Sequence, residues 1–370
     1  MTNRWPKWIA LAAIAAVALT WTHKPCLAAP DEARLAAAIK TIQSWKYGEK
    51  ADAQGTVAAE VVKAGQDPAA RKQMEKRMID ALAGAKSRGG KAFFCRQLVL
   101  VGSEAAVPAL ARLLADGESS HMARYALARL PGKAADKALL KALANADDVQ
   151  KVGMIYSLGR RGCKDAVEAI LPLVESKNDN VAVASLVALS RIDSGKAVAA
   201  IAKARTTVSP KVRPTATAAY LDCAKRMAAA GKAEAAVAIY RKLFAASEPT
   251  MCRIAALNGL VATAGDDRAL STVIAALGDK DAKVRQAAAP ALRDVPGPAA
   301  TRAIAAELSK QDGKVQPMLL IVLADRGDKA ALPAVVKVAQ GPAGPGRIAA
   351  LQALGSLGDA STVGLLAERA

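Results

Sequence analysis

Apolar residues recur along this chain at a nearly constant interval. From Leu98 onward, most equivalent apolar positions are about 31 residues apart, which is a period typical of repeat proteins. The interval from Leu98 to Leu127 is slightly shorter, and the gap from Leu189 to Val261 divides at Tyr220 into one ordinary interval and one longer unit. Such a period predicts an array of small stacked units, because one unit alone cannot bury its apolar face. The anchor positions are Leu98, Leu127, Leu158, Leu189, Val261, Leu292, Leu323 and Leu354.

Each unit predicts two helices joined by a tight turn. The first helix has apolar residues four and three residues before the anchor, at the anchor and three residues after it, which is the spacing of one helical face. Phe94, Cys95, Leu98 and Val101 follow this pattern. Four residues after the anchor most units have glycine or proline, which end helices or form turns, and Asp193 is the exception.

The second helix of each unit is rich in alanine. In most units alanine stands eight residues after the anchor, a small residue stands at 11, and larger apolar residues stand at 12 and 16. Small side chains let helix axes approach the short end of the usual ~8–10 Å separation. We therefore expect the alanines to form the contacts between neighbouring hairpins. The alanines at position eight are Ala106, Ala135, Ala166, Ala197, Ala269, Ala300 and Ala331, with Ala236 in the longer unit.

This repeat, with helix starts such as DAKVRQAAAPAL (281–292) and helix ends such as ALGSLGDAST (353–362), resembles the HEAT repeats. The short bacterial type found in phycobilisome-lyase-like proteins is the most similar. The resemblance covers about residues 90–370 and implies an all-α fold, a right-handed α-solenoid of stacked helical hairpins. It implies no particular activity, because this architecture serves many unrelated roles. The longer unit, residues 219–246, resembles a tetratricopeptide hairpin with Gly231 at its turn.

Three segments are expected along the chain. Residues 1–29 have two early cations, an apolar run from Trp8 to Trp21 and small residues at the end, which predicts a signal peptide cleaved after Ala28 or Ala29. An uncleaved N-terminal anchor is the alternative. Residues 30–90 predict a helical N-terminal cap region, and residues 91–370 predict the HEAT-like array. The chain ends at Ala370 within the expected last helix, which fits either a short final helix or a protein that continues further.

The chain is strongly basic, with a formal net charge of +19. Removal of the leader would take away Arg4, Lys7 and Lys24 and no acid, so most of this charge would remain. Such a charge favours anionic partners. For a periplasmic or secreted protein, these are another protein or an acidic cell-envelope polymer rather than nucleic acid.

The sequence predicts no catalytic residue, no metal site and no cofactor. His121 is the only histidine after the leader, and no Cys-x-x-Cys spacing, phosphate-binding loop or dinucleotide motif is present. We expect the cysteines after the leader to be small buried apolar residues, with a Cys223–Cys252 disulfide as the alternative. These cysteines are Cys95, Cys163, Cys223 and Cys252.

The candidate binding residues are cations on the second helices. The position 14 residues after the anchor lies about 200° from position 12 on a helix, so it faces away from the core. In the HEAT-like fold the second helices would line the concave side, where these cations would form a basic groove, although charges at such positions are often simply solvated. The cations at position 14 are Arg112, Lys141, Lys203, Lys242 and Lys337, and Lys137 and Arg302 lie on nearly the same face.

Two further groups of residues are weaker candidates. Tyr125 and Tyr156 stand two residues before their anchors and predict either a paired aromatic surface for a sugar or peptide, or a cover for a helix edge. Cations seven residues before the anchor resemble the structural arginine of HEAT-like repeats, with a ligand-binding stripe as the alternative. These cations are Lys91, Lys151, Arg213, Arg285 and Arg347.

The features together predict a non-enzymatic, exported, monomeric interaction scaffold with a basic concave groove for an extended acidic partner. The lyase-like resemblance leaves a chromophore attachment or transfer factor as a second interpretation, which the leader opposes. An N-terminal repeat module of a longer enzyme or haem-binding protein is a third. Nucleic-acid binding is a fourth, which the scarcity of aromatic residues opposes.

Overall fold

The described part of the chain is built from helices alone. The computed structural model describes residues 32–263, 267–295, 297–311 and 315–369, and no strand occurs within these ranges. The chain divides into two compact units, the first ending at Ala138 and the second beginning at Leu139. The expected leader lies outside the described residues. No helix within them has both the length and the apolar character needed to span a membrane.

The first unit begins with four helices that pack on one another. In it α2, α3 and α4 all contact α5, and α5 contacts α7 of the next hairpin. Helix α4 starts as the sequence predicts, with Pro68 in its first turn and the Asp67 carboxylate accepting a hydrogen bond from the Ala69 amide at 3.2 Å. Its helices are α2 (Glu32–Ser44), α3 (Asp52–Ala64), α4 (Pro68–Ala83), α5 (Arg88–Val101), η1 (Glu104–Ala106), α6 (Val107–Arg112), α7 (Ser120–Leu127) and the start of α8 (Ala134–Ala144).

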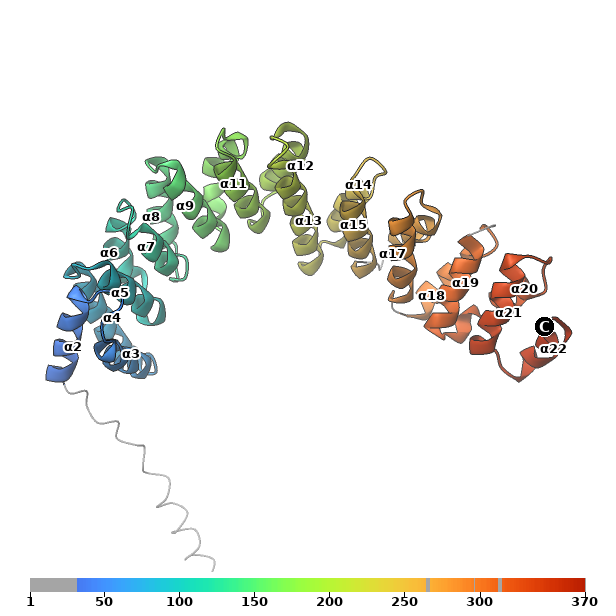
Figure 1. Cartoon of the computed structure of the whole chain (residues 1–370), viewed down its shortest axis with the longest axis horizontal. Coiled ribbons are helices and arrows are strands. Elements are labelled where there is room, and N and C mark those ends of the chain that lie inside the picture. The colour runs from blue at the N-terminus through green and yellow to red at the C-terminus, as the bar shows by residue number, and fades with distance from the viewer. Residues whose placement is uncertain (1–31, 264–266, 296, 312–314, 370) are drawn as a thin grey trace, which may run out of the picture. The chain divides into compact units, whose positions relative to one another are not determined.

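The second unit is a row of hairpins whose first helices contact one another in chain order. Helix α9 contacts α11, and the same contact repeats through α13, α15, α17, α19 and α21 (Figure 1). This is an all-α solenoid. Its first helices are α9 (Asp148–Arg160), α11 (Asp179–Arg191), α13 (Arg213–Ala229), α15 (Thr250–Ala262), α17 (Ala282–Arg293), α19 (Val315–Arg326) and α21 (Pro345–Leu357).

The second helices pack against these first helices, and several are broken by a 3-10 turn. Helices α12, α14 and α20 each contact the first helix that follows, and α18 contacts both α16 and α20. The elements are η2 (Lys164–Ala166), α10 (Val167–Ile170), η3 (Leu171–Glu175), α12 (Gly195–Thr207), α14 (Ala233–Leu243), α16 (Asp267–Ala275), η4 (Ala276–Gly278), α18 (Pro298–Glu307), η5 (Lys329–Ala331), α20 (Leu332–Ala339), η6 (Ala360–Thr362) and α22 (Val363–Arg369).

The predicted anchors form the core, with one correction. All the anchors except Val261 are at most 1% exposed. Val261 is half-buried, and Leu260 is fully buried in its place. On α15 the buried face runs through Ala256, Leu257 and Leu260. Counted from Leu260, these residues lie four residues before the anchor, three residues before it and at the anchor itself, as in the other units. The anchor of this unit is therefore Leu260, and the assumption of a constant interval selected the wrong one of two adjacent apolar residues.

The alanine columns are only partly where the sequence places them. The alanines eight residues after the anchor are buried in every unit whose side chain is described. The small residues at position 11 are half-buried, and Ala169 is exposed, so this column lies at the edge of the contact. One close helix approach lies outside both columns, between α9 and α11. There a Cβ added to Gly159 would lie 2.5 Å from the Cα of Ala188.

Polar side chains also connect one hairpin to the next. The Asn178 amide donates to Asp148 at 2.9 Å, Ser209 donates to Asp179 at 3.0 Å, and Thr250 donates to Asp281 at 2.5 Å. The partners in these pairs are separated by almost the same stretch of chain as successive anchors. The hydrogen bonds therefore follow the same period as the apolar core.

The cysteines are buried, as expected from their positions on apolar helix faces. Cys95, Cys223 and Cys252 are free thiols, and Cys163 is buried as well. The alternative Cys223–Cys252 disulfide is absent from the structure.

Candidate binding surface on the second helices

The cations predicted on the second helices all lie on the surface. Each is held by a helix whose apolar residues face the core, so the opposite face carries the charge to solvent. Arg112 on α6 and Lys137 on α8 belong to the first unit. The second unit holds the exposed side chains of Lys141 on α8, Lys203 on α12, Lys242 on α14, Arg302 on α18 and Lys337 on α20.

Two acidic residues interrupt this column of cations. Glu175, at the end of η3, pairs with Lys203 at 3.1 Å, and Glu168 on α10 pairs with Lys196 at 2.6 Å. All four side chains are more than half exposed. Exposed ion pairs contribute only ~0–1 kcal/mol, so a carboxylate of a partner can compete for these lysines. Glu168 stands ten residues after the anchor Leu158, at the position that Lys137 and Arg302 occupy in their units, whereas Glu175 lies outside the columns of cations. Counting cations alone therefore missed both acids.

The tyrosine candidates have different surroundings. The Tyr125 side chain is 45% exposed and the Arg129 guanidinium lies 3.6 Å from the centre of its ring. Tyr156, on α9, is 37% exposed. Because Tyr125 belongs to the first unit and Tyr156 to the second, a shared aromatic surface stays a prediction.

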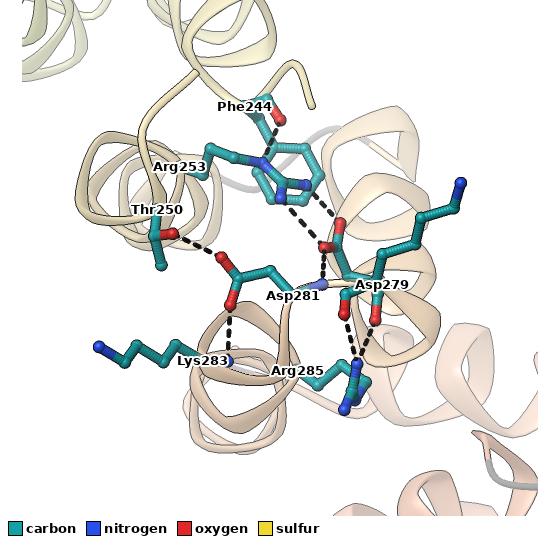
Figure 2. Close-up of polar contacts among 8 residues, drawn as sticks. Phe244, Thr250, Arg253, Asp279, Asp281, Lys283 and Arg285 are labelled. Carbon is teal, nitrogen blue, oxygen red and sulfur yellow. Dashed lines mark hydrogen bonds and ion pairs between the residues drawn. The ribbon is translucent and has the colours of Figure 1, made fainter. Parts of the chain in front are cut away.

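The cations seven residues before the anchor include one that the sequence analysis missed. With Leu260 as the anchor, this position is Arg253, which is 6% exposed. Its guanidinium binds the Asp279 carboxylate with both terminal nitrogens, Nη1 at 3.0 Å, and its Nε donates to the Phe244 carbonyl at 3.1 Å (Figure 2). Counting seven residues back from Leu260 instead of Val261 would have identified Arg253 from the sequence.

The Arg253–Asp279 pair joins α15 to the start of α17. The Asp279 carboxylate also accepts from the Asp281 amide at 2.8 Å, and Asp281 caps α17 by accepting from the Lys283 amide at 2.9 Å (Figure 2). The hydrogen bond from Arg253 lowers the pKa of Asp279 below its ordinary value, and the same bond raises the pKa of Arg253. Arg253 and Asp279 therefore serve the structure by binding each other.

Two other cations of this column make comparable contacts. Arg285 donates to the carbonyls of Asp279 at 2.6 Å and Lys280 at 3.0 Å, and Lys91 pairs with Asp116 at 3.2 Å in the first unit. The structural interpretation of the column therefore holds at these positions. Arg213 is exposed, and Arg347 lines a cavity that is described below.

Two further titratable side chains, Cys95 and His121, have shifted pKa values. Burial raises the pKa of the Cys95 thiol to about 12, so this thiol stays protonated and is a poor nucleophile. His121 is exposed on α7, and its pKa is lowered mainly by partial burial. Among the described residues, no group of three or more His, Cys, Asp or Glu side chains is arranged to hold a metal ion.

Comparison with known proteins supports the fold. Residues 137–220 match the family of HEAT repeats. No curated protein matches the chain. Among solved structures, human deoxyhypusine hydroxylase in complex with glycerol is 18% identical, with a TM-score of 0.33 over 69% of this chain and 96% of that chain. YibA of Escherichia coli is 20% identical, with a TM-score of 0.33 over 66% of this chain and 88% of that chain. Similarities of this size identify no activity.

Proposed function

We propose that this chain, whose residues 137–220 match the family of HEAT repeats, is a non-enzymatic interaction scaffold that binds an extended acidic partner. The partner would lie along the second helices of the second unit, whose cations would form the basic groove expected from the resemblance. The observation that carries the proposal is the exposure of every cation in the predicted column.

The cations would act together rather than singly. Each exposed contact between a lysine or arginine and a carboxylate contributes ~0–1 kcal/mol, so affinity would accumulate over several repeats. A guanidinium group such as that of Arg302 can hold a carboxylate with two parallel hydrogen bonds, which adds geometric specificity. Because the charges are exposed, added salt would screen them.

The test is the binding of fluorescein-labelled polyglutamate to the purified chain, followed by fluorescence anisotropy. The triple variant Lys141→Glu, Lys242→Glu and Arg302→Glu, all in the second unit, should weaken binding about tenfold or more, which corresponds to ~0.5 kcal/mol for each lost contact. Raising the ionic strength from about 0.05 M to about 0.5 M should weaken the binding of the unaltered chain steeply.

The matched control changes net charge equally at exposed lysines outside the second helices. The variant Lys177→Glu, Lys211→Glu and Lys283→Glu should bind polyglutamate nearly as well as the unaltered chain, because these lysines lie outside the proposed groove. Equal weakening in both triple variants, or binding indifferent to salt, would reject the proposed groove. Equally tight binding of single-stranded DNA of the same charge would favour a nucleic-acid partner instead.

We also propose that the protein is exported by residues 1–29. The supporting observation is the order of cations, apolar run and small residues in that segment. Fusion of residues 1–29 to alkaline phosphatase in a Gram-negative bacterium should give active, processed enzyme in the periplasm. Cytoplasmic retention of the fusion would exclude this route.

A further inference from the structure

A cavity of about 540 Å³ lies near the C-terminal end of the second unit. Its walls come from the end of α18, one face of α20 and the glycine- and proline-rich segment 341–346 that leads into α21. Pockets of roughly 300–1,000 Å³ are typical for small ligands, so this volume is large enough for part of a peptide.

The walls of this cavity are mainly apolar. Ala305, Ala306 and Leu308 contribute one side, and Ala334 and Val338 contribute the other. No aspartate or glutamate is among the described residues that line it. The nearest acid along α18, Glu307, is bound to Lys310 at 2.8 Å.

Two cations lie at the edge of these apolar walls. Lys337 is the cation of the predicted second-helix column on α20, and Arg347 is the cation seven residues before the anchor on α21. Among the described residues neither side chain makes an ion pair or a side-chain hydrogen bond. Arg253, Arg285 and Lys91, which occupy the column of Arg347, all make such contacts. Their charge is therefore available to a ligand.

The cavity is held in place by the chain around it. The Gln316 side chain donates to the Leu308 carbonyl at 2.9 Å, and its Oε1 would lie 2.0 Å from a Cβ added to Gly346. Gly346 thus allows α21 to begin directly against Gln316. Pro342 and Pro345 fix the backbone of the connecting segment, which lowers the entropy lost when a ligand is bound.

We propose that this cavity binds a short acidic segment of the partner protein, with one apolar side chain inside the cavity and flanking carboxylates on Lys337 and Arg347. This inference rests on the proposed scaffold function and names the kind of partner segment that one repeat pair recognises. A peptide fits better than a small anion, since only a side chain of leucine size would use the apolar walls. The arginine suits a carboxylate because its planar group can donate two parallel hydrogen bonds.

The test compares two fluorescein-labelled hexapeptides, EDLLDE and EDSSDE, by fluorescence anisotropy with the full chain. The leucine peptide should bind about tenfold more tightly or better, because burial of a leucine side chain stabilises by ~1.5–3 kcal/mol. The double variant Lys337→Glu and Arg347→Glu should weaken binding of EDLLDE by about tenfold or more. Ala306→Trp, which fills the cavity without changing charge, should weaken it comparably.

The control variant carries Lys283→Glu and Lys329→Glu, which change charge equally at exposed lysines that do not line the cavity. It should bind EDLLDE within about twofold of the unaltered chain. Equal binding of both hexapeptides, or equal weakening in the control, would overturn the cavity inference. Circular dichroism of each variant establishes that the fold is kept.

Failure of this inference is distinct from failure of the scaffold proposal. If polyglutamate binds through the second helices while EDLLDE binds no better than EDSSDE, the cavity inference alone is wrong. If EDLLDE binds at the cavity while polyglutamate does not bind, the extended groove is wrong and the cavity inference stands.

Discussion

At the scale of single residues, the most informative side chain is Arg253. A buried arginine is tolerated only when its charge is paired and its donors are satisfied, and here Asp279 and the Phe244 carbonyl do both. The arginine joins one hairpin to the next, as the apolar core also does. Its position seven residues before Leu260 places it in the column that Lys91 and Arg285 also occupy.

We predict that Arg253→Ala lowers the free energy of unfolding by about 3 kcal/mol, because it leaves the partly buried Asp279 carboxylate without its partner. Urea unfolding followed by circular dichroism measures this. Arg293→Ala removes an arginine from the exposed pair with Asp294 and should cost less than about 0.5 kcal/mol. Equal effects of the two substitutions would show that the buried pair carries no special stability.

The same pair predicts a dependence of stability on pH. The pKa of Asp279 is lowered in the folded chain, so its stabilising contribution is complete above the unfolded pKa of about 4 and is lost as pH falls through the lower folded value. Between about pH 7 and about pH 3, the Asp279→Asn variant should therefore lose less stability than the unaltered chain. The urea midpoint at each pH measures this, and parallel losses in both proteins would contradict it.

At the scale of helices, close approach depends on individual small residues rather than on a whole column. Gly159 faces Ala188 where α9 and α11 meet, whereas Gly355 on α21 has no neighbouring heavy atom within 4 Å of an added Cβ. These two helical glycines therefore differ in what an added methyl group would contact.

We predict opposite effects of the same substitution at these two glycines. Gly159→Ala should destabilise the fold by about 1–3 kcal/mol, because the new methyl group overlaps the α11 backbone. Gly355→Ala should stabilise it by up to about 1 kcal/mol, since alanine favours the helix and finds open space. Thermal unfolding of both variants decides this, and stabilisation at both sites would exclude a tight contact between α9 and α11.

The sequence predicted helices and their buried faces well because burial imposes a helical spacing that can be counted. It failed at Val261, where the loop length changed and two apolar residues were adjacent, so spacing alone could not choose between them. It also failed for Glu175 and the Gly159 contact, which depend on how neighbouring hairpins meet. The cavity beside Lys337 and Arg347 could not be predicted, because it arises from three elements and a glycine- and proline-rich segment.

At the scale of the whole molecule, the repeat distributes charge as well as apolar residues. The core of each hairpin continues into the next, and the outward face of successive second helices carries a cation in many of the hairpins. A solenoid of this kind presents an extended surface, so a long partner can contact many repeats at once. The net charge of +19 would attract such a partner from a distance.

The most direct test of the second-helix surface is lysine footprinting of the unaltered chain. N-hydroxysuccinimide acetate would label exposed lysines with and without polyglutamate, and mass spectrometry would read each site. Bound polyglutamate should protect Lys141, Lys242 and Lys337 and leave Lys177, Lys211 and Lys283 labelled as before. Uniform protection of all six lysines, or protection of only Lys177, Lys211 and Lys283, would contradict a partner held along the second helices.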